Sequence, residues 1–259
     1  MEENKSLQNR GADYTASALK SVLGAVPIVG SVLTEIVGNI IPNQRVDRLA
    51  DFATKLAEKV QEHEKEMIQK RLLEPEGTDI LEEALWQSAR ALSEERRKQI
   101  ASMVKNGLTK QEIDLVETKK LLLLLSQLND VEVFILYSQA DRLHQDKDFM
   151  EKFGEAIKPV RAWIRAPQKQ LDKHAISESL RKHLVQLGLL QPYFPFVGHN
   201  QIPEFDQFTG GFKNSGYQIT LLGRLLLRSI DFYPEGSDPN LPEISIQVGP
   251  PVRPVPPSS

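Results

Sequence analysis

Two stretches near the end of the chain carry the clearest structural pattern: 179-SLRKHLVQLGLL-190 and 217-YQITLLGRLLLRSI-230. In the first, leucines at positions 180, 184 and 187 recur at helical spacing and share a face with Ile176. Gly188 ends this pattern, which predicts a helix over 175–187. In the second, Tyr217–Thr220 is strand-like, and residues 221–230 predict a closing helix.

The residues between these stretches are typical of a β-hairpin. A strand-like aromatic stretch follows Gly188-Leu189-Leu190, and the glycine-rich sequence FTGGFKNSG at 208–216 predicts a turn. The order helix, hairpin, helix is that of a winged helix. We therefore expect a winged-helix-like α+β domain with a short β-hairpin at this end of a mainly α-helical protein.

Three further helices are expected before this pattern, at 119–127, 129–139 and 148–158. The second of them begins at Asn129, a favourable N-cap residue, with Glu132 at its third position. These helices indicate that the second half of the chain is helical up to the hairpin.

The region after Pro42 is also helical, with apolar residues on one side and mixed Glu and Lys on the other. The apolar side predicts one long helix over 44–72 and consists of Val46, Leu49, Phe52, Leu56, Val60 and Met67. A break at 74–77 follows. The Glu/Lys-rich face at 58–71 indicates a solvated helix surface, with a coiled-coil partner as the alternative.

Capping patterns divide the residues after this break into further helices. Asp79 and Glu82 resemble a capping pair, and Ser93 is expected to begin the next helix. Asn106-Gly107 is expected to stop that helix, and Thr109 with Glu112 to open another. The patterns predict an α-helical bundle over 1–115, a winged-helix-like domain over 116–235 and a disordered, Pro-rich tail over 236–259.

The most apolar stretch, residues 21–41, lies near the start of the chain. It is long enough to span a membrane, but Pro27 and Glu35 make it a poor permanent span. A stripe of small residues at Gly30, Thr34 and Gly38 would let a second helix approach closely. Two interpretations stay open: a buried hairpin of the bundle, or a segment that self-associates or enters the inner membrane.

Composition excludes several classes of protein. The 259 residues have a net charge of −3, so no global field favours nucleic acid or anionic lipid. The absence of Cys excludes disulfides, thiolate metal sites and Cys nucleophiles. The polar, acidic N-terminus lacks the form of a signal peptide, so we expect a cytoplasmic protein, peripheral at the inner membrane if residues 21–41 act there.

A search for catalytic patterns gives no candidate. The histidines are scattered, without an HExxH motif or paired metal spacing, and the glycines near Gly24 lack the Lys-Ser/Thr of a P-loop. We therefore expect no enzyme activity, no cofactor, no metal and no small-molecule substrate.

Two surfaces are candidates for binding. The first is a run of 25 residues with a net charge of +5, whose basic members are Lys158, Arg161, Arg165, Lys169, Lys173, Arg181 and Lys182. We expect Lys173, Arg181 and Lys182 to project from the core, where a DNA-reading winged helix would use them on phosphates or base edges. The patch could also contact a protein partner. The second is the aromatic wing, where Phe205, Phe208, Phe212 and Tyr217 accompany few cations; this composition favours a protein interface over DNA.

The order of segments in the chain resembles that of bacterial abortive-infection proteins of the alpha type. A Gly-rich apolar segment comes first, charged helices follow, and the two quoted stretches come last. The resemblance covers about residues 20–232, and Thr220-Leu221-Leu222-Gly223-Arg224 is its most specific part. It implies a role in phage defence and no particular reaction. We expect a sensor or effector that acts through a protein partner or self-association; the alternative is a winged-helix DNA-binding transcriptional regulator.

Overall fold

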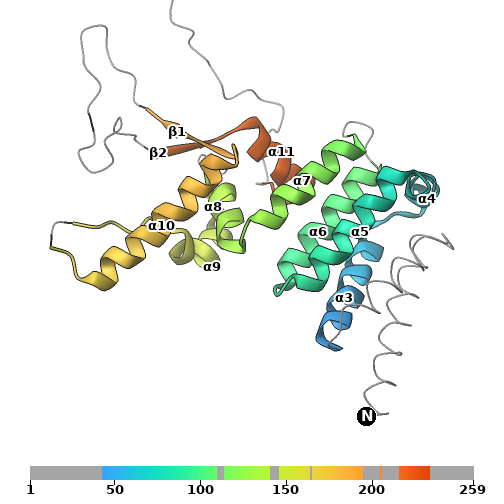
Figure 1. Cartoon of the computed structure of the whole chain (residues 1–259), viewed down its shortest axis with the longest axis horizontal. Coiled ribbons are helices and arrows are strands. Elements are labelled where there is room, and N and C mark those ends of the chain that lie inside the picture. The colour runs from blue at the N-terminus through green and yellow to red at the C-terminus, as the bar shows by residue number, and fades with distance from the viewer. Residues whose placement is uncertain are drawn as a thin grey trace, which may run out of the picture.

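The structure is a computed structural model that describes residues 43–109, 114–140, 146–163, 165–194, 205 and 216–233. The mainly helical fold with a small antiparallel sheet is confirmed (Figure 1). In chain order its elements are α3 (Asn43–Lys59), the short 3-10 helix η1 (Glu62–Glu64), α4 (Lys65–Leu72), α5 (Pro75–Arg90), α6 (Glu94–Thr109), α7 (Leu115–Gln127), α8 (Asp130–Ala140), α9 (Lys147–Ile157), α10 (Gln168–Gln186), β1 (Leu190–Tyr193), β2 (Gly216–Ile219) and α11 (Leu221–Ser229).

Helices α3 to α7 form a bundle, on the right of Figure 1. Helix α3 packs mainly against α6 and α5, and α5 also packs against α7. The expected apolar face of the first helix is buried there: Leu49, Phe52 and Leu56 are at most 1% exposed. Burial of such large side chains is the main source of stability in this part of the fold.

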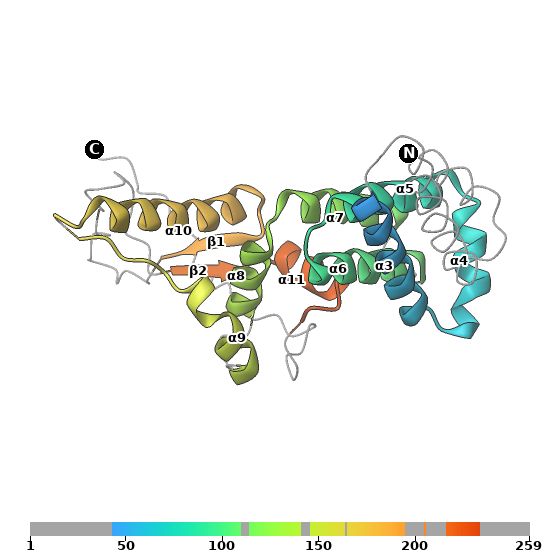
Figure 2. The same ribbon diagram turned by 90° about the horizontal axis from the view of Figure 1, so that it is seen from below.

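Helices α8 to α10 and the sheet form the other half of the molecule, and α11 lies between the two halves (Figure 2). Strand β1 pairs antiparallel with β2, with Leu190 opposite Ile219 and Tyr193 opposite Gly216. Helix α11 packs against α6, α7 and α8, so one buried apolar cluster runs through both halves. The division into domains 1–115 and 116–235 stays a prediction.

The glycine of the Thr-Leu-Leu-Gly-Arg turn has a clear packing role. Thr220 caps α11 by accepting a hydrogen bond from the Gly223 amide at 3.0 Å. A Cβ atom on Gly223 would lie 2.5 Å from the carbonyl oxygen of Leu189 and 2.8 Å from the side chain of Ile219. Glycine therefore allows α11 to approach the end of the sheet closely.

The prediction of one helix over 44–72 is wrong, because the chain turns between α3 and α4. Gln61 is extended, with φ −80° and ψ 156°, and its amide donates to the carboxylate of Glu64 at 2.9 Å. The same carboxylate pairs with Lys105 of α6 at 2.7 Å. The bend thus lets Glu64 reach α6, and α4 packs against α5 and α6.

The capping prediction at Asp79 is also wrong. Helix α5 begins at Pro75, whose fixed φ suits the first helical position and whose missing amide hydrogen costs nothing there. Asp79 lies inside the helix and forms an ion pair with Lys119 of α7.

The predicted stop at Asn106-Gly107 is wrong because both residues are buried inside α6. The Asn106 side chain donates to the carbonyl oxygen of Ser229 at 3.0 Å, and Gly107 leaves space for Thr118 of α7. Helix α6 therefore continues to Thr109, and α7 begins after Asp114, not after the expected Thr109 cap.

Three other predictions of helix starts and faces can be compared with the structure. The prediction that Ser93 begins a helix is confirmed, because its hydroxyl accepts a hydrogen bond from the Arg96 amide at the start of α6. Asn129 and Glu132 form the expected reciprocal pair, at 2.9 and 2.8 Å. Helix α10 begins at Gln168, earlier than the expected 175, and Ile176 is 64% exposed instead of facing the core.

Several predictions fall on other parts of the chain. Residues 21–41, with Gly30, Thr34 and Gly38, and the tail 236–259 lie outside the described residues. Among the described helices, none alone has the length and apolar composition to cross a membrane; α7 and α8 meet that test only as a pair bent by 113°. The winged-helix arrangement stays a prediction, supported by the order α10, β1, β2, α11.

Candidate functional site

The predicted basic patch lies on a projection of the molecule, residues 157–182, which we call the basic arm. It consists of the segment after α9 and most of α10. In both views the N-terminal end of α10 lies on the side of the molecule away from the bundle (Figures 1 and 2). The arm therefore presents its charges away from the main core.

Four side chains on one face of α10 hold the segment 157–161 against the helix. The side chain of Gln170 donates to the carbonyl oxygen of Arg161 at 2.8 Å, and His174 Nδ1 lies 2.7 Å from that of Val160. Ser177 accepts a hydrogen bond from the Val160 amide at 3.2 Å. Because positions three and four apart share a helix face, residues 170, 174, 177 and 181 form a continuous seam.

Arg181 completes this seam and is buried, with 7% of its surface exposed. Its guanidinium donates to the carbonyl oxygen of Ile157 at 2.7 Å and to both oxygens of Ser177 at 2.9 Å. Burial lowers the pKa of Arg181, although Glu178 and Tyr217 partly offset this effect. Arg181 was expected to project from the core; the structure instead places it where it holds the arm together.

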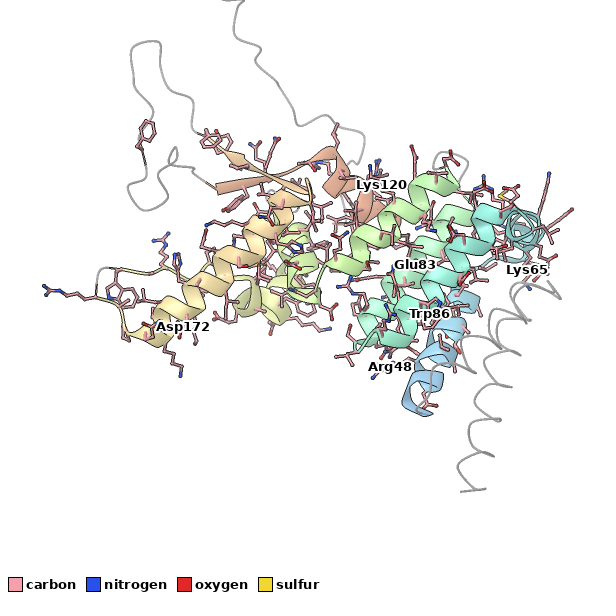
Figure 3. The ribbon with its side chains drawn as sticks, in the orientation of Figure 1. Arg48, Lys65, Glu83, Trp86, Lys120 and Asp172 are labelled. Carbon is pink, nitrogen blue, oxygen red and sulfur yellow. The ribbon has the colours of Figure 1, made fainter. Side chains whose placement is uncertain are left out.

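The other six predicted cations of the patch are exposed: Lys158, Arg161, Arg165, Lys169, Lys173 and Lys182. Lys158 forms an exposed ion pair with Glu155 at 3.2 Å. Asp172, at the outer part of α10 in Figure 3, accepts a hydrogen bond from the side chain of Gln168 at 2.7 Å. The surface of the arm is thus strongly basic.

Apolar side chains lie between these cations. Trp163 is 59% exposed and Ile176 64% exposed, and Leu171 is 38% exposed. Single exposed apolar residues are normal, but three on one projection together with six cations form an unusual surface. Aromatic and aliphatic side chains with neighbouring arginines are typical of protein interfaces.

A hollow of about 1310 Å³ lies beside the arm, and we call it the α9–α10 groove. Helices α8, α9 and α10, the segment 157–162 and β2 line it. Apolar residues including Phe149, Met150 and Val160 alternate with charged residues of both signs. Its volume exceeds that of usual small-ligand pockets and suits a polypeptide segment.

The predicted wing residues are only partly described. Tyr217 is half-buried on β2 and lines the α9–α10 groove. Phe205 is 62% exposed. Phe208 and Phe212 lie outside the described residues. The structure therefore brings Tyr217 close to the basic arm, which links two candidate surfaces that the sequence placed separately.

A buried polar connection behind the arm was not predicted. The carboxylate of Glu132, 3% exposed, lies 2.7 Å from His183 Nδ1 on α10. Nearby, buried Arg96 of α6 donates to Asp130 and to the carbonyl oxygens of Leu125 and Leu128. The sequence indicated only that Glu132 takes part in the N-cap of its helix. It gave no signal for the contacts of this cluster with Arg96 and His183, because these residues are far from residues 130–132 in the sequence.

Among the described residues, no group of three or more His, Asp or Glu side chains is placed to hold a metal ion. No family model, curated protein or solved structure matches the chain significantly. The resemblance to abortive-infection proteins therefore stays a prediction.

Proposed function

We propose that the chain is a non-enzymatic protein-interaction protein whose basic arm binds an acidic partner. The observation that carries this proposal is the combination of exposed Trp163, Leu171 and Ile176 with six exposed cations on one projecting element. A partner with acidic and apolar side chains would complement both kinds of residue.

The buried seam supports a binding role because it fixes the arm before a partner arrives. Gln170, His174, Ser177 and Arg181 hold the backbone of 157–161 in one arrangement. A surface that is already ordered loses less conformational entropy on binding. The interface residues can therefore contribute more of their interaction energy to affinity.

DNA binding is the second candidate, favoured by the same six cations. Burial of Arg181 removes one of the three residues that a DNA-reading α10 was expected to use. The apolar side chains on the arm add nothing to phosphate neutralisation. These two observations make a protein partner the better-supported choice.

The test measures fluorescence anisotropy of two labelled probes with the full chain. One probe is a synthetic peptide of about 20 residues in which Glu and Asp alternate with Leu and Phe. The other is a DNA duplex of about 20 base pairs, measured over a range of salt concentrations. We expect saturable binding of the peptide, reduced about tenfold by Lys169→Gln/Lys173→Gln.

The matched control is Lys98→Gln/Lys120→Gln, which removes the same charge from exposed positions on α6 and α7. Equal loss with both double variants would show a general charge effect and contradict the proposal. Tight duplex binding with a steep salt dependence, and no peptide binding, would favour the DNA-binding regulator instead.

The proposed biological setting is bacterial phage defence, supported by the resemblance in sequence order. Residues 21–41 would then supply self-association or contact with the inner membrane. The measurement is plating efficiency of phage on a bacterial host that expresses the full chain, compared with the Lys169→Gln/Lys173→Gln variant. Protection by the unmodified chain and its loss in the variant would connect the arm to defence; equal plating on all hosts would reject the setting.

A further inference from the structure

The chain leaves the described structure beside the α9–α10 groove. After α11, Phe232 stacks on Tyr137, with ring centroids 4.6 Å apart, and contacts Phe149 at 6.2 Å. Phe149 is itself part of the groove lining. Tyr233, the last described residue of this segment, accepts a hydrogen bond from Arg224 at 2.6 Å. Residues 234 onward therefore start from a fixed point next to the groove.

Charged side chains of both signs line the groove. Lys158 and Arg161 come from the arm and form what we call the arm wall, while Glu151 and Glu155 belong to α9; Lys158 also pairs with Glu155 at 3.2 Å, an exposed and exchangeable contact. Glu178 and buried Arg181 come from α10. Beyond the groove the arm continues with the exposed cations Arg165, Lys169 and Lys173, so the positive charge of the arm extends past the groove. Between the walls, Met150 is 46% exposed and offers an apolar contact.

The sequence that follows Tyr233 fits this arrangement. Residues 234–248 read PEGSDPNLPEISIQV and contain three acidic residues and no basic residue. Their last part alternates apolar Ile244, Ile246 and Val248 with polar residues, which is the pattern of an extended segment with one apolar side. Fifteen residues can extend about 50 Å, enough to follow a groove of this size.

We propose that residues 234–248 of the same chain bind in the α9–α10 groove. Their carboxylates, Glu235, Asp238 and Glu243, would contact Lys158 and Arg161 on the arm wall. Their apolar side chains would cover Met150 and Val160. Because the segment is tethered at Tyr233, its effective concentration at the groove is of millimolar order, so weak individual contacts are enough.

This inference rests on the proposed function and adds regulation to it. The segment carries the same kind of residues, acidic and apolar, that we expect in the partner of the basic arm. It would therefore compete with the partner for Lys158 and Arg161. Binding of a partner would require the chain's own segment to leave the groove, so the free protein would be autoinhibited.

The first test is carbodiimide cross-linking of the intact chain at high dilution, followed by mass spectrometry of the monomer. Carbodiimide joins a lysine amine to a carboxylate in contact with it. We expect cross-links from Lys158 to Glu235, Asp238 or Glu243. The internal control is Lys55 with Glu94, whose atoms lie 2.8 Å apart. Formation of the control cross-link without any cross-link from Lys158 to these residues would overturn the proposal.

The second test compares binding of the acidic peptide probe by the intact chain and by Glu235→Gln/Asp238→Asn/Glu243→Gln. We expect the variant to bind at least fivefold more tightly, because its own segment competes less. The matched control is Glu58→Gln/Glu66→Gln/Glu82→Gln, which changes the net charge equally at exposed positions of the bundle. An equal gain in both variants would reject competition.

The two tests separate the two proposals. Cross-links without peptide binding by any variant would keep the docked segment and reject the acidic partner. Peptide binding without cross-links, and without a gain in the variant, would keep the partner and reject the docked segment.

Discussion

The guanidinium of Arg181 donates a hydrogen bond to the carbonyl oxygen of Ile157, 24 positions earlier in the chain, at 2.7 Å. This bond joins the last residue of α9 to the C-terminal part of α10 and holds the start of the basic arm against that helix. A residue that looked like a nucleic-acid contact in the sequence therefore has a structural role.

Replacing Arg181 should destabilise the protein. Arg181→Ala would leave the carbonyl oxygen of Ile157 and the hydroxyl of Ser177 without this donor, and each lost hydrogen bond of a buried polar group costs about 1–3 kcal/mol. We expect the free energy of unfolding, measured with urea, to fall by about 2–4 kcal/mol. Lys173→Ala, at an exposed position of the same helix, should change it by less than about 0.5 kcal/mol. Equal stability of the two variants would contradict the structural role.

Gly107 should not tolerate a side chain. A Cβ atom there would lie 2.2 Å from Cγ2 of Thr118, so Gly107→Ala would push α6 and α7 apart. We expect a loss of about 1–3 kcal/mol in the free energy of unfolding and partial recovery in Gly107→Ala/Thr118→Ala. Gly154→Ala is the comparison: its Cβ would lie 3.4 Å from Met150, and the substitution should stabilise α9 by about 0.4–1 kcal/mol. Destabilisation of similar size at both positions would contradict the packing argument.

The first turn of α8 should depend on Asn129. Its side chain accepts a hydrogen bond from the Glu132 amide at 2.9 Å, so Asn129→Ala should cost about 1 kcal/mol, measured as the shift in the urea midpoint. Asn129→Ser keeps an acceptor and should recover most of this loss. The capping role would be wrong if serine were no better than alanine.

Acid should destabilise the protein through specific carboxyl groups. Burial raises the pKa of Glu64, but hydrogen bonds from Lys105 and from the Gln61 amide outweigh it and hold the pKa below its ordinary value. Burial also raises the pKa of Asp51, but hydrogen bonds and charge interactions with Arg97 and Lys55 outweigh burial and hold this pKa below its ordinary value. A carboxyl group whose pKa is lower in the folded than in the unfolded protein stabilises the folded state at pH values above its unfolded pKa. This stabilisation is lost as the pH falls through its folded pKa.

We therefore expect the urea midpoint to fall as pH decreases below about 4.5, the region of ordinary carboxyl pKa values. Glu64→Gln should lower the midpoint at pH 7 and flatten its dependence on pH. Glu66→Gln, at an exposed position on α4, is the control. A pH dependence that is the same in both variants would exclude Glu64 as a source of acid sensitivity.

Local patterns predicted the helices well and their ends less well. Ser93 and Asn129 were identified because a cap needs only residues three positions away. The break at Gln61 and the continuation through Asn106 depend instead on partners in other helices, Lys105 and Ser229. Sequence periodicity contains no information on such partners, so it predicted one long helix and an early stop.

The candidate site was predicted in part for the same reason. The run of basic residues is a local feature, and six of its seven cations are exposed as a binding surface requires. The seventh, Arg181, is four positions from Ser177 on the same helix face, but its contact with Ile157 depends on how the chain returns after α9. The α9–α10 groove, which combines five separate segments, had no signal in the sequence.

Helix α11 comes late in the sequence, so the core between α6, α7 and α8 can be completed only near the end of synthesis. Asn106 of α6 contacts Asp231 at 2.8 Å, 125 positions later, and α11 fills space between α6, α7 and α8. A nascent chain that ends before residue 221 has made the helices around this space but not the one that fills it. Closing so long a loop is entropically costly and slow. We expect the growing chain to expose apolar surface until α11 is released, which makes this interval the stage at which it most needs chaperones.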